Sequence, residues 1–138
     1  MGTVTATVTR SIAAPPTRVL EFLHDLPARS QILTTNYSAV QTEGADVIAF
    51  HFAAGGRERD YRLHSDLTGT TLTEKDEHSS FQNVWTVSPE GSGSTVTLSG
   101  SWQGASGVGG FFEGLFAPMG LRRIYSEVLA NLERQLGG

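Results

Sequence analysis

Asp76 and His78 could form an acid–base pair in this sequence. They are two positions apart, so on a strand both side chains point to the same face of the sheet. A carboxylate beside an imidazole favours the charged ring and holds it in one orientation. With the hydroxyl of Tyr61 opposite, such a set suits enolisation, aldol cyclisation or dehydration of a β-keto chain. Asp76, His78 and Tyr61 are therefore the catalytic candidates, with a purely structural Asp-x-His pattern as the alternative.

The register of successive hairpins predicts which residues surround this set. Paired residues of antiparallel strands share a face, so one turn fixes the partners along both strands. The turn at residues 68–70 predicts the pairs Leu67–Leu72, Ser65–Glu74, Leu63–Asp76 and Tyr61–His78. The next two turns predict Glu74–Trp85, Asp76–Asn83 and His78–Phe81, then Val87–Val96, Trp85–Leu98, Asn83–Gly100 and Phe81–Trp102.

The shared face mixes polar and large apolar side chains, which predicts an internal cavity. Buried polar groups without partners cost a few kcal/mol each, so such a face suits a cavity that holds water or ligand. Gly100, opposite Asn83, leaves further room. Ligand contacts are predicted for Phe50, Phe52, Leu63, Glu74, Asn83, Trp85, Leu98 and Trp102. The alternative is a one-residue slip that turns the strand over and exposes Glu74, Asp76 and His78.

Other kinds of site find little support. The register places His51 and His64 on the outer face and His78 inside, so the three cannot converge on a metal. The glycine-rich stretch 104–116 lacks the third glycine of a dinucleotide fingerprint and any Walker lysine, so a hinge beside a cavity mouth is favoured over a phosphate cradle. Neither a metal nor another cofactor is expected.

The composition bounds the class of protein. The 138 residues fit a single domain, 1–138, and the formal charge of −4 without a basic block argues against nucleic-acid binding. The chain has no cysteine, no signal pattern and no apolar run long enough to span a bilayer, so we expect a cytoplasmic protein without an integral membrane segment. Either a monomer or a homodimer is compatible with the sequence.

The elements follow from the periodicity of apolar residues. Residues 3–12 alternate like a strand, one or two short helices occupy about 16–31, and six strands separated by turn residues run from 32 to 103. The segment from about 109 to 136 repeats like a helix, and the part after Pro118 is about 27 Å long at 1.5 Å per residue. Additional ligand contacts are predicted from this segment at Phe112, Phe116, Met119 and Tyr125.

Three segments resemble the START-like or SRPBCC superfamily, in its polyketide cyclase/dehydrase and lipid-transport group. They are IAAPPTRVLEFL (12–23), GSGSTVTLSGSW (91–102) and FAPMGLRRIYSEVLANLERQL (116–136). The resemblance implies an α+β helix-grip fold, a curved seven-stranded antiparallel sheet around a long C-terminal helix with a hydrophobic cavity between them. Many members carry a tryptophan where this chain has residues 30–33, so the cavity entrance is expected to differ.

Three functions follow as hypotheses. The first is binding of a small hydrophobic molecule, such as a lipid, a polyketide or another aromatic compound, in the cavity. The second, permitted by the resemblance, is a polyketide aromatase/cyclase or dehydratase that uses Asp76, His78 and Tyr61. The third is a protein-interaction module that works through its surface.

Overall fold

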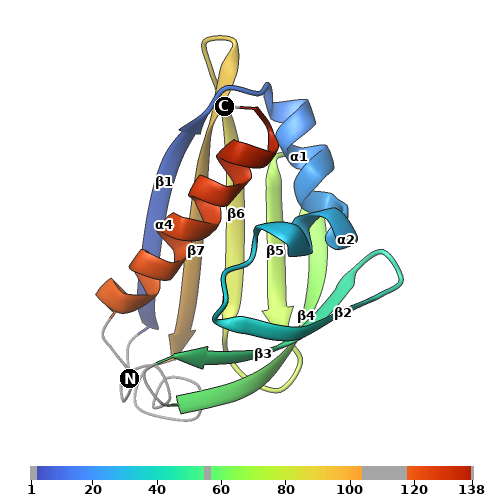
Figure 1. Ribbon diagram of the computed structural model, residues 1–138, viewed down its shortest axis with the longest axis vertical. Coiled ribbons are helices and arrows are strands. Elements are labelled where there is room, and N and C mark those ends of the chain that lie inside the picture. Colours follow the sequence, from blue (N-terminus) through green and yellow to red (C-terminus); the bar gives the residue numbers. More distant parts are fainter. Residues whose placement is uncertain (1–2, 55–56, 104–117, 138) are drawn as a thin grey trace.

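The fold is described by a computed structural model that covers residues 3–54, 57–103 and 118–137 (Figure 1). In chain order the strands are β1 (Thr3–Ile12), β2 (Tyr37–Glu43), β3 (Val47–Ala54), β4 (Arg57–Thr68), β5 (Thr71–Asp76), β6 (Gln82–Glu90) and β7 (Gly93–Gln103). The helices are α1 (Pro16–His24), α2 (Leu26–Arg29), the 3-10 helix η1 (Ser30–Ile32) and α4 (Pro118–Gln135). This order confirms the predicted helix-grip architecture.

The seven strands form one antiparallel sheet in the order β1-β7-β6-β5-β4-β3-β2. Each of β2 to β7 lies beside its neighbour in sequence, because short turns join consecutive strands. Gly44, Gly69 and Gly91 have φ angles of 60°, 61° and 59° at three of these turns, a conformation that glycine adopts without strain. The first strand returns to the far edge and pairs with β7.

The predicted register is confirmed in two hairpins and wrong in the one between them. Leu63 pairs with Asp76 in β4–β5, and Asn83 pairs with Gly100 in β6–β7, as predicted. Between β5 and β6, however, Glu74 pairs with Asn83, not with Trp85. The connection is longer than predicted because β5 ends at Asp76, whose backbone N–H bonds the Phe81 carbonyl at 3.0 Å. The shift is by an even number of residues, so the faces are unchanged.

Helix α4 crosses the concave face of the sheet and buries its apolar stripe there (Figure 1). The buried residues lie at the helical spacing that the sequence predicts for this segment: Leu121, Ile124, Tyr125, Val128, Leu129, Leu132 and Leu136. A Cβ at Gly100 would clash with the Tyr125 hydroxyl, so this glycine allows the helix to approach β7. The part of the predicted helix before Pro118 lies outside the described residues.

The short helices α1, α2 and η1 cover one end of the interior, the space between the sheet and α4 (Figure 1). Pro16 occupies the first turn of α1, where no backbone N–H is needed. Asn131 of α4 donates from Nδ2 to the Ile32 carbonyl at 2.9 Å, which joins η1 to the long helix. Residues on this side, Leu26, Arg29 and Ile32, are buried against the interior.

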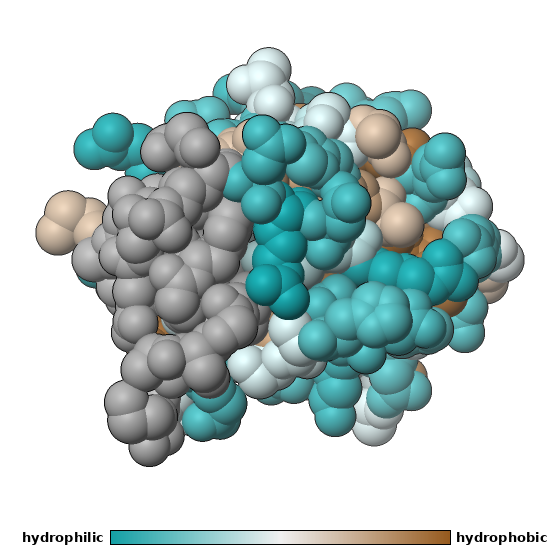
Figure 2. All heavy atoms as spheres, turned by 90° about the horizontal axis from the view of Figure 1, so that it is seen from below, coloured by the Kyte–Doolittle hydropathy of each residue, from teal (hydrophilic) through white to brown (hydrophobic). Residues whose placement is uncertain are grey.

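One face of the molecule shows how polar and apolar residues are distributed on its surface. On the face shown in Figure 2, hydrophilic residues cover most of the coloured area and hydrophobic residues cover a smaller part. Among the described residues, no helix has the length and apolar content that crossing a membrane requires.

Candidate functional site

A continuous cluster of aromatic rings lines the interior. We call it the aromatic cluster, and it consists of Tyr37, Phe50, Phe52, Tyr61, Phe81 and Trp102. Tyr37 meets Phe50 and Phe52 edge-on with ring centroids 5.0 Å apart, and Tyr61 lies 5.1 Å from Phe81. Alternate residues of a strand share a face, so β2, β3, β4 and β7, together with Phe81 just before β6, contribute rings to one surface. The cluster gives the interior an apolar wall.

A buried ion pair lies in the same interior. Arg29 at the end of α2 donates from Nη2 to Glu74 Oε2 of β5 at 2.5 Å, and the two side chains are 3% and 1% exposed. Trp85 of β6 donates from Nε1 to the other carboxylate oxygen of Glu74 at 2.9 Å. The Arg29 guanidinium carbon also lies 5.4 Å from the centre of the Trp85 ring. We refer to Arg29 and Glu74 as the interior ion pair.

Glu74 and Arg29 differ in how fully their polar atoms are bonded. Glu74 accepts from Arg29 and Trp85 and, at 3.3 Å, from the Ser65 hydroxyl. Nε and Nη1 of Arg29 are buried, and in the described part of the chain neither has a hydrogen-bond partner. Buried donors in native proteins are nearly always bonded, so such an arginine requires an explanation.

Three tyrosine hydroxyls face the interior and stay protonated. Burial is the main cause that raises the pKa of Tyr37, Tyr61 and Tyr125 above the ordinary value of a tyrosine. Tyr125 donates a hydrogen bond to the Asn83 amide oxygen. These groups can therefore donate hydrogen bonds without adding charge to the interior.

Two small voids lie between the sheet and α4. The first, about 10 Å³, is lined by Tyr37, Phe50, Phe52, Tyr61, Phe81, Asn83, Leu121 and Tyr125. The second, about 20 Å³, is lined by residues that include Arg29, Glu74, Trp85, Leu63 and Leu98. Each holds at most about one water molecule. The interior expected to hold a cavity thus contains only small voids among the described residues, because their bulky side chains fill most of this space.

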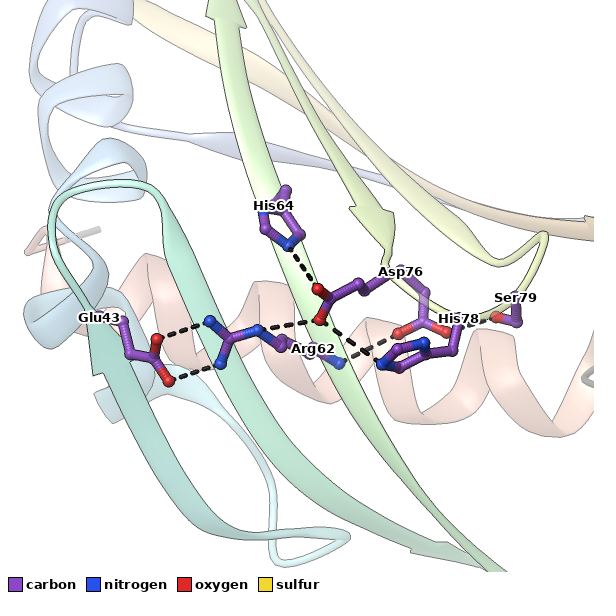
Figure 3. A network of polar contacts seen from close by, with 7 residues as sticks. Glu43, Arg62, His64, Asp76, His78 and Ser79 are labelled. Atoms are coloured by element: carbon purple, nitrogen blue, oxygen red, sulfur yellow. Dashed lines mark hydrogen bonds and ion pairs between the residues drawn. The ribbon is translucent and has the colours of Figure 1, made fainter.

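The predicted acid–base set is not assembled. Tyr61 faces the interior. Asp76 is buried, but its carboxylate is bonded to neighbouring groups of the hairpin: it accepts from the Arg62 backbone N–H at 3.0 Å and from the Ser79 hydroxyl at 2.5 Å (Figure 3). His78 lies in the turn after β5 with 78% of its side chain exposed, 3.6 Å from Glu77. The prediction that His78 shares the inner face with Asp76 is wrong, because the strand ends two residues before it.

Most of the predicted ligand contacts do lie together. Phe50, Phe52, Leu63, Glu74, Asn83, Trp85, Leu98, Trp102 and Tyr125 are all buried and face the interior. Because Glu74 is buried, the alternative register, in which a one-residue slip would expose it, is wrong. Met119 is 68% exposed, and Phe112 and Phe116 lie outside the described residues.

Sequence reasoning missed Arg29 and Tyr37. A usable signal existed for Arg29, which stands three positions after Leu26 and three before Ile32, in the middle of an apolar stripe. Tyr37 is the first residue of β2 and lines both voids. In the part of the chain that the structure describes, no group of histidine and acidic residues has the arrangement of a metal site.

Comparison with known proteins places this arrangement in context. A family model described as "Polyketide cyclase / dehydrase and lipid transport" matches residues 3–137. The NMR structure of the KanY protein is 43% identical over 100% of both chains, with a TM-score of 0.88. A crystal structure from Thermus thermophilus (20% identity, 96% of each chain, TM-score 0.76) and one of a Panax ginseng major latex-like protein (12%, 97% of each chain, 0.72) share the fold. No curated protein matches the sequence.

Proposed function

Because the chain belongs to the polyketide cyclase/dehydrase and lipid transport family, of the START-like superfamily, we propose that it binds a small hydrophobic molecule in the interior between the sheet and α4. The observation that carries the proposal is the interior ion pair: Arg29 is buried beside a void with two of its nitrogens unbonded among the described residues. A core that served stability alone would gain nothing from this arrangement, since apolar residues of similar volume are often as stable.

The walls of the interior suit an apolar ligand with few polar groups. Ligand sites are typically lined by aromatic and aliphatic side chains with a small number of polar groups that fix orientation. The aromatic cluster and Leu63, Leu98 and Val128 supply the first kind, and Arg29 and Asn83 supply the second. Catalysis by Tyr61, Asp76 and His78 is not part of the proposal, because His78 points to solvent.

Entry of a ligand requires that a side chain move, and Tyr37 is the best candidate. It lines both voids, so its displacement would join them. It is only half-buried, and it belongs to β2, an edge strand whose pairing with β3 is interrupted after Ser38. Moving a half-buried ring on an edge strand disrupts less packing than moving Phe50 or Tyr125 of the core.

The proposal is tested with ethylbenzene as the probe and NMR as the readout. We expect a saturable shift of the indole N–H signal of Trp85, which lines the larger void, while backbone signals of Thr97 and Ser99 on the outer face stay constant. In Tyr37→Ala the ligand no longer has to displace a ring, so the affinity should rise about tenfold.

Phe22→Ala is the matched control for that variant. Phe22 is also a half-buried aromatic residue, but it lies on α1 and lines neither void. Its truncation should leave the affinity for ethylbenzene unchanged. The proposal is abandoned if neither ethylbenzene nor its oxygen-bearing analogues acetophenone and benzoate, up to their solubility limits, produce a saturable shift in the natural protein or in Tyr37→Ala.

A further inference from the structure

We infer that Arg29 binds a neutral oxygen acceptor of the ligand, so that the preferred ligands are apolar ketones, esters or amides and not hydrocarbons or free acids. This inference rests on the proposed function and specifies the class of molecule that the interior takes. It starts from the hydrogen bonds of the interior ion pair, not from the fold.

The interior ion pair has N–H donors that lack an acceptor among the described residues, while its two charges compensate each other. Glu74 already accepts from Arg29, Trp85 and Ser65. Arg29 uses Nη2 for Glu74, while Nε and Nη1 remain buried without a partner among the described residues. A guanidinium carries five N–H groups and no acceptor, so only an oxygen or another acceptor can bond these nitrogens. The arrangement therefore calls for an acceptor from outside the pair.

The charge balance favours a neutral acceptor. The Glu74 carboxylate lies 2.5 Å from Arg29 and compensates its charge, so a bound carboxylate would leave a net negative charge in the interior. Burial of an uncompensated charge is far more costly than burial of a hydrogen-bonded neutral group. Another cation on this part of the sheet, Arg59, has its guanidinium over the Tyr61 ring at 5.9 Å. Tyr61 lines the first void only, so Arg59 does not offset a charge placed at Arg29.

The surroundings of Arg29 leave space for one polar atom and an apolar body. The void beside it, about 20 Å³, is the size of a single oxygen-bearing group or water. Its other walls include Leu63, Leu98 and Val128, and it borders Tyr37 and Phe50, which also line the first void. A carbonyl oxygen at Arg29 would thus direct the remainder of the ligand toward the aromatic cluster.

Three probes of nearly equal shape test the inference: acetophenone, ethylbenzene and benzoate. The measured quantity is the affinity for acetophenone divided by that for ethylbenzene, which cancels their contacts with the apolar walls. The ratio is compared between the natural protein and Arg29→Met/Glu74→Leu, a replacement of the pair by apolar residues that preserves folding in other proteins. A hydrogen bond to a charged donor is worth about tenfold or more, so the ratio should fall by roughly that factor in the double variant.

Two further variants make the result specific. Arg29→Lys keeps the charge beside Glu74 but removes the guanidinium donors, so we expect a ratio between those of the natural protein and the double variant. Glu43→Leu/Arg62→Met removes a similar pair from the outer face and should leave the ratio as it is in the natural protein. Circular dichroism and thermal unfolding establish that each variant is folded.

The possible outcomes separate a failure of the inference alone from a failure of the proposed function. A ratio that stays within twofold in the double variant overturns the inference, while ethylbenzene binding still supports the proposed function. A tighter complex with benzoate than with acetophenone overturns the choice of a neutral acceptor. If none of the three probes binds to the natural protein or to any variant, the inference and the proposed function both fail.

Discussion

Arginine–glutamate pairs occur on both sides of the sheet, and they differ most clearly in how far solvent reaches them. On the outer face, Arg62 contacts Glu43 and Glu77, and Glu77 also lies near His64 and His78; we call these five residues the outer network (Figure 3). The Arg62–Glu43 contact is 2.5 Å, as short as the Arg29–Glu74 contact. However, the side chains of Arg62 and Glu43 are 36% and 52% exposed, against 3% and 1% for the interior ion pair.

The comparison shows that a short distance does not measure what a pair contributes. In the outer network water solvates every charge, so breaking one contact costs little. The interior ion pair is almost completely excluded from solvent, so each of its groups depends on its partner. Two pairs of the same chemistry and the same distance are therefore expected to differ in what the loss of one partner costs.

The largest expected effect is the loss of one partner from the interior ion pair. Glu74→Leu leaves the Arg29 guanidinium buried and uncompensated, so we expect the free energy of unfolding to fall by about 3–5 kcal/mol in urea denaturation. Glu43→Leu should cost about 0–1 kcal/mol, because Arg62 remains solvated and keeps Glu77 at 3.0 Å. Equal losses in the two variants would contradict the distinction between the faces.

The next effect concerns the contact of α4 with the sheet. In Gly100→Ala the new Cβ would clash with the Tyr125 hydroxyl and disturb its hydrogen bond to Asn83. We expect Gly100→Ala to lower the free energy of unfolding by about 1–3 kcal/mol, as overpacking does in other cores. The loss should be smaller when Gly100→Ala is made in a Tyr125→Phe variant, which lacks the clashing hydroxyl. Ser101→Ala, on the same strand but the outer face, should change stability by less than about 0.5 kcal/mol.

The fold was predictable because its signals are local. Alternation of apolar residues, Pro16 in the first turn of α1 and the short turn at Gly69 fix the elements and the β4–β5 register. The β5–β6 register was not predictable in this way. There Asp76 binds the Arg62 backbone and the Ser79 hydroxyl, and these contacts end the strand early.

The candidate site was predictable only in part, because its central features depend on contacts between distant segments. Inward-facing residues such as Trp85 and Asn83 follow from the strand period. The stripe of Leu26 and Ile32 indicates that Arg29 is buried, but its pairing with Glu74, on a strand far along the chain, is encoded by no local pattern. The space that Gly100 was expected to leave is occupied by Tyr125, since a helix side chain fills a gap that the strand pattern alone predicts to be open.

The smallest effect is a pH dependence at the outer face. His51 contacts Asp60 through Nδ1 at 2.6 Å and Glu58 through Nε2 at 2.8 Å. The hydrogen bond to Asp60 is the main cause that raises the pKa of His51 above its ordinary value of about 6.5. Folding therefore favours the charged ring: this contribution to stability is complete below pH of about 6.5 and is lost as the pH rises through the folded-state pKa.

Asp60→Asn tests this pH dependence and its contrast with the interior. NMR titration should give a lower pKa for His51 in the variant, and the difference in unfolding free energy between the natural protein and the variant should shrink as the pH rises above 6.5. Added salt should reduce this difference, because both partners of the exposed contact are screened, but leave the cost of Glu74→Leu nearly constant. A His51 pKa that is the same in both proteins would show that the contact with Asp60 does not persist in solution.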